Sequence, residues 1–271
     1  MNVLIKFLYY LTRSFPNIMH FFGALSAEAL MVIGIRKNVV IKNLKIAFPG
    51  RSIYFYDILF REIYRHFFFQ TVETVYYYFF PEKLIKKAEL RGREILENAV
   101  KSGRQIFYYT GHLGFWELIP VYIKRFFRTA VVLYQKIRDR DVNDFMLKFR
   151  SRSGGIFIER RKSLDIIRHL KSGYDIGMLV DQRPIEKGIS VEFFGRPTKF
   201  YFSSFKIAEK FNGFPVFIFS YKEGKKIVFE ASECPAADAA GMAKAYVAKL
   251  EKMIRLYPSQ YFWLHNRWKY G

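Results

Sequence analysis

The residue types best suited to chemistry lie in the segment GHLGFWE at 111–117. It follows QIFYYT at 105–110, a short apolar run typical of a buried strand, and leads into a helical pattern over 115–125. A histidine on the turn and a carboxylate in the first helical turn can meet at such a corner. A carboxylate turns a histidine into a general base by fixing its tautomer and stabilising the imidazolium. The pattern therefore predicts a catalytic pair of His112 and Glu117. The alternative is a turn histidine beside a glutamate that only favours a helix N-terminus.

Further polar residues follow other apolar runs. Asp181 and Gln182 end the apolar run over 175–182, and open α/β sheets place their sites at the carboxyl ends of the strands. The glycines of the 111–117 segment let the backbone turn tightly and approach a ligand, which makes Gly114 a candidate substrate contact. We therefore expect Asp181 and Gly114 to lie near His112.

A basic segment over 148–162 is a candidate anion-binding region. Its only acidic residue is Glu159, and it contains Ser-Gly-Gly at 153–155, a backbone that can form an anion nest. Such a segment can bind phosphates, carboxylates or an acidic partner, although a solvated basic face is the ordinary alternative. The basic residues are Lys148, Arg150, Arg152, Arg160, Arg161 and Lys162.

The order of apolar runs predicts the fold class. Strand patterns alternate with helical patterns, which indicates an α/β fold with a mostly parallel or mixed central sheet flanked by helices. We expect strands at 105–110, 130–136, 155–159, 175–182, 190–195, 213–222 and 226–232, and helices over 53–80, 82–104, 115–125, 141–152, 163–173 and 238–257. Because no linker or internal repeat interrupts this order, we expect a single domain over 36–271.

The N-terminal segment 1–35 is predicted to associate with a membrane. Residues 15–35 approach the ~20 apolar residues that span a bilayer, but Glu28 within them would be costly at its centre. A basic flank follows from Arg36 onward, which favours the cytoplasmic side. Apolar helices that span the bilayer, or lie on it, are both compatible with this pattern, as is burial against the domain.

The net charge of the chain indicates which kinds of partner it can bind. The chain has 271 residues, with 45 Lys and Arg against 24 Asp and Glu, so its formal net charge is +21. Nucleic acid, an anionic bilayer, a phosphorylated lipid and an acidic carrier protein all suit that charge. A hydrophobic fraction of 51% excludes a disordered polycation, and the single cysteine, Cys234, excludes a disulfide scaffold. No nucleic-acid-binding module is recognisable, so we expect no nucleic acid partner.

The chain resembles the bacterial lipid A biosynthesis acyltransferases, the lauroyl and myristoyl transferase group of the lysophospholipid acyltransferase superfamily. GHLGFWE is similar to the H-x4-D/E motif of that superfamily. Seven segments in family order carry the resemblance: VVIKNLKIAFP (39–49), REIYRHFFFQTVE (61–73), TGHLGFWEL (110–118), FRSRSGG (149–155), Asp-Gln (181–182), FFGRP (193–197) and QYFWLHNRWK (260–269).

The resemblance implies a glycerolipid acyltransferase-like fold and a reaction. An acyl chain would pass from acyl carrier protein or acyl-CoA to a hydroxyl of a lipid A precursor or related anionic glycolipid, at the cytoplasmic face of the inner membrane. His112 would be the base and Glu117 its partner. Arg150, in the R-x-R-S pattern, and Asp181 would position the phosphorylated glycolipid or the reacting groups. Direct attack needs no metal or cofactor, so none is expected.

Some residues depart from the family pattern. Arg183 and Pro184 follow the Asp-Gln pair where the family usually has Asp and Gly, and the family's Thr-rich stretch is replaced over 198–204. The acceptor and the chain length therefore stay open. A lysophospholipid, a glycerophosphate or a phosphatidylinositol mannoside are alternative acceptors. A basic nucleic-acid-binding protein and a non-catalytic membrane protein are more distant alternatives.

Overall fold

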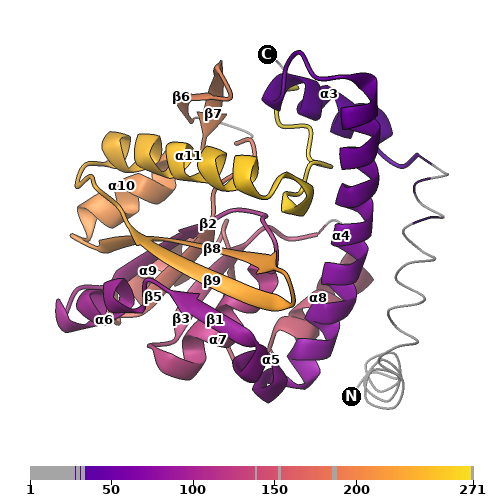
Figure 1. The fold of residues 1–271 in the computed structure, drawn as a ribbon. Helices are drawn as coiled ribbons and strands as arrows, with labels where there is room; N and C mark the ends of the chain where they lie inside the picture. The colour runs from indigo at the N-terminus through magenta and orange to yellow at the C-terminus, as the bar shows by residue number, and fades with distance from the viewer. Residues whose placement is uncertain are drawn as a thin grey trace.

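The computed structural model describes residues 34–137, 139–151, 154–184 and 188–269, together with Glu28 and Met31. Over these residues a seven-stranded sheet has the order β1-β9-β8-β2-β5-β3-β4, and helices cover both of its faces (Figure 1). Neighbouring strands are parallel except for the antiparallel pair β8–β9, which confirms the predicted mixed α/β fold. The strands are β1 Ala88–Arg91, β2 Ile106–Thr110, β3 Ala130–Tyr134, β4 Ile156–Glu159, β5 Asp175–Leu179, β8 Phe214–Glu223 and β9 Lys226–Glu233.

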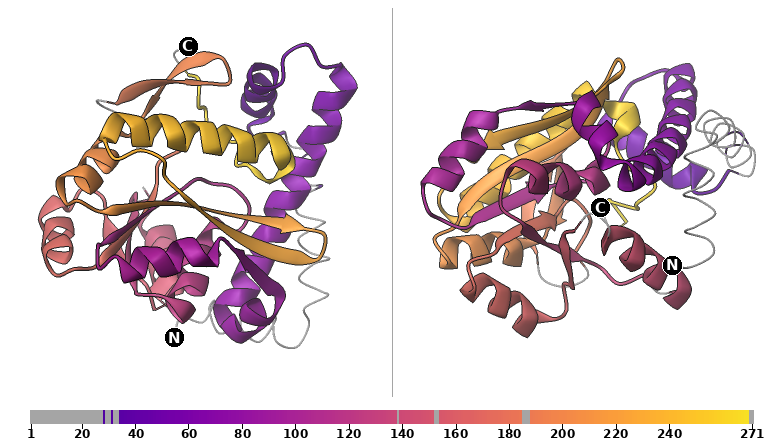
Figure 2. Two further views of the ribbon diagram at one scale, coloured as in Figure 1. Left: turned by 60° about the vertical axis from the view of Figure 1, so that its left-hand side comes forward. Right: turned by 90° about the horizontal axis from the view of Figure 1, so that it is seen from below.

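Two layers of helices bury the sheet. Figure 2 shows α11 along one face and α6 along the other. Every residue of β2 is buried, as expected of a strand covered on both sides. The α-helices are α3 Lys37–Ala47, α4 Ile53–Phe79, α5 Pro81–Lys87, α6 Arg93–Lys101, α7 Ile119–Phe126, α8 Arg140–Ser151, α9 Ser163–Lys171, α10 Phe202–Lys210 and α11 Ala239–Leu256. Two short 3-10 helices are η1 Trp116–Leu118 and η2 Pro258–Gln260.

Aromatic side chains form the contacts on each face. The ring of Tyr109 in β2 stacks on Phe205 of α10 with centroids 4.6 Å apart. On the other face Tyr122 of α7 stacks on Phe229 of β9 at 4.4 Å. The two faces therefore have separate cores, and β2 contributes alternate residues to each. The strand that carries the active-site turn is consequently held on both sides.

Helix α11 confirms the prediction for residues 238–257. The carboxylate of Asp238 accepts hydrogen bonds from the backbone N–H groups of Ala240 and Gly241, which caps the helix start. The helix ends before Pro258. The expected apolar stripe is buried throughout: Met242, Tyr246, Leu250, Met253 and Ile254.

One expectation about secondary structure is wrong, and one expected strand is present but lies elsewhere than in the main sheet. Residues 82–104 do not form one helix, because the short strand β1 pairs with β9 between α5 and α6. Gly92 follows β1 with φ +73°, a conformation that glycine adopts without strain and that starts α6 in a new direction. The strand expected at 190–195 is outside the main sheet. It forms a separate hairpin of β6 Ile189–Phe193 and β7 Arg196–Phe200.

Helix α4 confirms the helix predicted over 53–80 and lies along one side of the sheet (Figure 1). Its buried Glu73 is neutralised by Lys87 and Lys222, with N–O distances of 3.3 and 2.9 Å. Within the part of the chain that the structure describes, no helix combines the length and the apolar character needed to cross a bilayer. Most of the 1–35 segment lies outside the described residues, so its membrane association stays a prediction.

Candidate active site

The candidate site lies where four adjacent strands of the sheet end. His112 follows β2, Asp181 follows β5, Gln135 follows β3, and Arg160 follows β4. In the sheet these strands are neighbours in the order β2-β5-β3-β4, and all three pairs are parallel. Their carboxyl ends therefore meet at one edge, where a cavity of about 750 Å³ opens.

The imidazole of His112 is held by Asp181. Its Nδ1 lies 2.7 Å from Oδ1 of the carboxylate, and the backbone N–H of His112 donates to Oδ2 at 3.0 Å. The Asp181 side chain is 1% exposed, whereas that of His112 is 20% exposed and lines the cavity. A buried carboxylate thus holds both the ring and the backbone of a residue that reaches substrate space.

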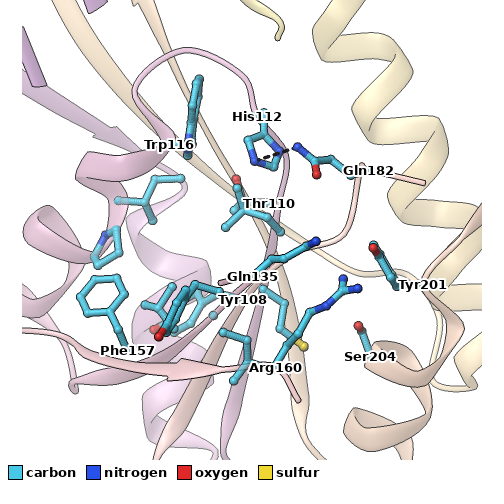
Figure 3. A pocket seen from close by; sticks show the side chains of 18 of the residues that line it. Tyr108, Thr110, His112, Trp116, Gln135, Phe157, Arg160, Gln182, Tyr201 and Ser204 are labelled. Carbon is cyan, nitrogen blue, oxygen red and sulfur yellow. Dashed lines mark hydrogen bonds between the residues drawn. The ribbon is translucent and has the colours of Figure 1, made fainter. Parts of the chain in front are cut away.

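The electrostatics keep Asp181 ionised. Burial alone raises the pKa of Asp181, but hydrogen bonds from His112 and attraction to the protonated form of its ring, with a smaller contribution from Arg267, bring that pKa below its ordinary value. Because an ionised carboxylate only accepts hydrogen bonds, Nδ1 carries the proton and Nε2 keeps a free lone pair. Nε2 lies 3.4 Å from the amide nitrogen of Gln182, the contact dashed in Figure 3. His112 is therefore in the tautomer that a general base requires.

The carboxylate that contacts His112 is thus Asp181, whereas the sequence pattern predicted Glu117 as its partner. Glu117 binds Arg150 through two hydrogen bonds, Nε to Oε2 at 3.0 Å and Nη2 to Oε1 at 2.5 Å. The hydroxyl of Tyr78 donates to the backbone carbonyl of Glu117 at 3.1 Å. Both Glu117 and His112 line the cavity, so the predicted residues come together in one site but not as a hydrogen-bonded pair.

The turn that carries His112 is held by distant segments. Gly114 has φ +54°, and a Cβ at this position would lie 2.1 Å from the carbonyl oxygen of Ser220 in β8. Its N–H donates to the carbonyl of Gln260 at 2.9 Å. The carbonyl of His112 accepts from the N–H of Phe262, also at 2.9 Å. Gly114 does not line the cavity, so the structure gives it a packing role, and its predicted substrate contact stays a prediction.

One part of the cavity is apolar. Tyr108, Ile119, Val132 and Gly177 line it between the sheet and α7. The same four residues also line a small pocket that continues toward Thr129. A Cβ at Gly177 would meet Val132 Cγ2 at 3.6 Å, an ordinary contact, so the glycine leaves free space in the floor of the cavity. The shape suits a hydrocarbon chain.

The other predicted anion-binding residues differ in position. Arg160 and Arg161 line the cavity at the far end from His112. Arg150 lines it beside Glu117, with its guanidinium 6.0 and 5.9 Å from the ring centroids of Tyr134 and Phe157. Arg152 lies outside the described residues. The predicted basic segment therefore contributes at least three cations to one cavity.

The segment over 260–268 contributes residues that the spacing of motifs did not single out. The rings of Trp116 and Phe262 flank His112, with centroids 5.2 and 5.9 Å from it. Burial lowers the pKa of His265 to about 4, so this histidine stays neutral. Its Nε2 accepts from the N–H of Arg183 at 3.2 Å, which holds the chain after Asp181. Only the family-like sequence of this segment signalled its importance.

The fold and the site define an α/β enzyme with a carboxylate-held histidine beside an apolar cavity. Residues 4–270 match the family model described as bacterial lipid A biosynthesis acyltransferase. The match covers nearly the whole chain, so the chain belongs to this family and is an acyltransferase. A comparison with curated proteins gave no match.

Proposed function

We propose that the protein transfers a fatty acyl chain from acyl carrier protein, or from acyl-CoA, to a hydroxyl of a lipid A precursor or a related anionic glycolipid. The observation that carries the proposal is the hydrogen bond between His112 and the buried Asp181 at the opening of a cavity with an apolar part. The base activates a hydroxyl, and the apolar part accepts the chain that is transferred. Family membership supports the same class of reaction.

The geometry supports direct attack on the thioester. Nε2 of His112 takes the proton of the acceptor hydroxyl while its oxygen bonds to the thioester carbonyl carbon. The tetrahedral oxyanion collapses, the carbon–sulfur bond breaks, and the imidazolium returns the proton to the departing thiolate. Asp181 stabilises the imidazolium between these steps. The amide of Gln182 is close enough to Nε2 to donate to an oxygen that reacts there.

Glu117 and Arg150 have a positioning role in this proposal. Their side chains are 19% and 16% exposed, and the two hydrogen bonds join them in a planar, bidentate pair. A pair fixed in this way presents a rigid polar wall to the substrate beside His112. The positive charge of the Arg150 guanidinium, at the wall of the cavity, suits an anionic or hydroxylated group of the acceptor.

The net charge of the chain supports the proposed partners. A chain of +21 attracts both an acidic carrier protein and an anionic lipid surface. We place the enzyme at the cytoplasmic face of the inner membrane, with 1–35 as the attachment. Deletion of residues 1–35 is expected to move the protein from the membrane fraction to the soluble fraction on cell fractionation. Retention in the membrane fraction would assign the attachment to another surface.

Acyl transfer with purified protein tests the reaction. Protein in detergent is incubated with labelled acyl carrier protein and, separately, acyl-CoA, against a panel of acceptors: a phosphorylated disaccharide lipid, a lysophospholipid, glycerophosphate and a phosphatidylinositol mannoside. We expect the disaccharide lipid to be acylated, and His112→Ala to lower the rate by about 10³-fold or more. His169→Ala, on α9, is the matched control and is expected to keep full activity.

The panel also separates the alternatives. Acylation of a lysophospholipid, glycerophosphate or mannoside alone would keep the chemistry and replace the proposed acceptor. Equal rates for the wild-type protein and His112→Ala would contradict the mechanism. Failure to acylate any acceptor with either donor would favour a non-catalytic membrane protein.

A further inference from the structure

The charged groups around the cavity are not balanced. Among the described residues that line it, Glu117 is the only carboxylate, against Lys136, Arg150, Arg160 and Arg161. The Glu117 carboxylate is already bound by Arg150. Three cations therefore remain at the end of the cavity that is formed by the exits of β3 and β4.

Arg160 is the cation of this group whose surroundings Figure 3 shows. Its guanidinium lies 4.7 Å from the ring centroid of Tyr201, and no carboxylate of the described residues pairs with it. The turn that presents it is closed by the N–H of Lys162, which donates to the carbonyl of Glu159 at 2.8 Å. The N–H of Arg160 itself donates to the carbonyl of Tyr134 at 2.9 Å. The backbone thus holds a cation for which the described part of the chain supplies no carboxylate partner.

The groups around Arg160 are hydrogen-bond donors. Figure 3 shows its guanidinium between the side chains of Gln135 and Tyr201, with the Ser204 hydroxyl nearby. Ser203 and Ser204 belong to the first turn of α10, and no described side chain caps that helix start. The backbone N–H groups of a helix start add to the positive potential of the arginine. Cations, hydroxyls and an amide together match a tetrahedral anion with several acceptor oxygens better than a planar carboxylate.

The distance from the base limits which phosphate fits. The strand that precedes Arg160 is three places along the sheet from the strand that precedes His112. With neighbouring strands about 4.8 Å apart, the two strand ends are separated by about 14 Å. A phosphate at this end, on a substrate that reacts at His112, is therefore joined to the reacting group by an extended arm.

We propose that Arg160, with Arg161 and the Ser203–Ser204 start of α10, forms a subsite for a phosphate ester of a substrate whose reacting group lies at His112. The inference rests on the proposed function, since the reacting groups define the other end of the cavity. The phosphate has two possible sources. One is the phosphodiester arm that carries a thioester donor, which the separation favours, and the other is the phosphorylated headgroup of the acceptor.

Binding of small probes tests the subsite without turnover. The affinities of 4′-phosphopantetheine and pantetheine, and of glucosamine phosphate and glucosamine, are measured by calorimetry on the full chain in detergent. We expect one phosphorylated probe to bind more tightly than its phosphate-free counterpart. Arg160→Gln should lower the affinity for that probe by about 10- to 100-fold. Arg160→Lys should weaken it less. Arg168→Gln, which removes an exposed arginine from α9, should leave it unchanged.

The outcomes assign the source or reject the subsite. If Arg160→Gln loses affinity for 4′-phosphopantetheine alone, the phosphate belongs to the donor arm. If it loses affinity for glucosamine phosphate alone, the phosphate belongs to the acceptor. The proposal is overturned if Arg160→Gln binds both phosphorylated probes as the wild type does, or if neither phosphate improves binding to the wild type. A protein that selects a phosphorylated probe through Arg160, yet acylates no acceptor, would retain the subsite and lose the proposed function.

Discussion

Asp181 binds His112 at two points, the ring Nδ1 at 2.7 Å and the backbone N–H at 3.0 Å. The carboxylate therefore sets the tautomer, the ring orientation and the position of the turn together. Its own burial excludes water from these hydrogen bonds. Loss of this single carboxylate should consequently affect the reaction far more than loss of any group that only lines the cavity.

Replacement of Asp181 tests this directly. Asp181→Asn keeps the shape but allows the amide to donate to Nδ1, which leaves the proton on Nε2 and removes the base. We expect kcat to fall by about 10³- to 10⁴-fold. Single-turnover acyl transfer measures the loss, and thermal unfolding verifies that the variant is folded. A folded Asp181→Asn protein with a nearly normal kcat would contradict the assigned partnership.

Replacement of Glu117 is expected to act mainly on stability. Glu117→Gln leaves the largely buried Arg150 without its counter-charge, at a cost of about 2 kcal/mol in the free energy of unfolding. The fall in kcat should be smaller than that of Asp181→Asn. The double variant Glu117→Gln/Arg150→Met should recover part of the stability, as urea unfolding will show. If Glu117→Gln instead lowers kcat as strongly as Asp181→Asn at unchanged stability, Glu117 acts on His112, as the sequence pattern predicted.

These two carboxylates show how far the sequence could predict the site. The apolar runs, and the turn residues between them, predict the buried strands, α11 and the His112 turn. The structure confirms these elements. The partner of His112 does not follow from local spacing, because Asp181 is 69 residues away and arrives through the β2–β5 pairing. Strand β1 was missed because its four residues alternate charged and apolar between two helices.

The Cβ position of Gly177 is expected to influence acyl-chain length. The glycine leaves space in the apolar floor of the cavity, and the side chain of Gly177→Val would occupy it beside Val132. Each methylene that no longer fits costs about 0.8 kcal/mol, or about fourfold in kcat/KM. A competition assay with donors of graded chain length should shift toward shorter chains. An unchanged preference in an active Gly177→Val protein would place the chain elsewhere.

Gly114 and Gly195 form a matched pair for the role of the turn. Both have positive φ, +54° and +71°, but an added Cβ strikes the Ser220 carbonyl at the first and contacts nothing within 4 Å at the second. Gly195→Ala should therefore cost about 1 kcal/mol of stability from backbone strain alone. Gly114→Ala should cost at least about 2 kcal/mol more and lower activity. Equal melting temperatures for the two variants would show that the turn can relax around Gly114.

Acid should destabilise the protein through His66 on α4. Burial, with the positive charge of Lys222, lowers the pKa of His66 to about 4 from an ordinary 6.5, and its Nε2 is buried without a described partner. The unfolded chain therefore binds the proton first, so this contribution is complete above pH 6.5 and is lost as the pH falls toward 4. Between pH 7 and 5 the loss is about 1 to 2 kcal/mol. Urea unfolding at both pH values should show a smaller loss for His66→Gln, and parallel losses would exclude His66 as the cause.

The contacts of residues 260–262 with the His112 turn also have a consequence during synthesis. The N–H of Phe262 binds the His112 carbonyl, and the carbonyl of Gln260 binds the Gly114 N–H. A ribosome makes the turn long before it makes these partners. Until residues 260–262 are made, the nascent chain contains His112, but its turn lacks these two hydrogen bonds. The turn therefore reaches its final structure late. The turn that carries the catalytic histidine therefore gains these two hydrogen bonds only after strand β9 and helix α11 have been synthesised.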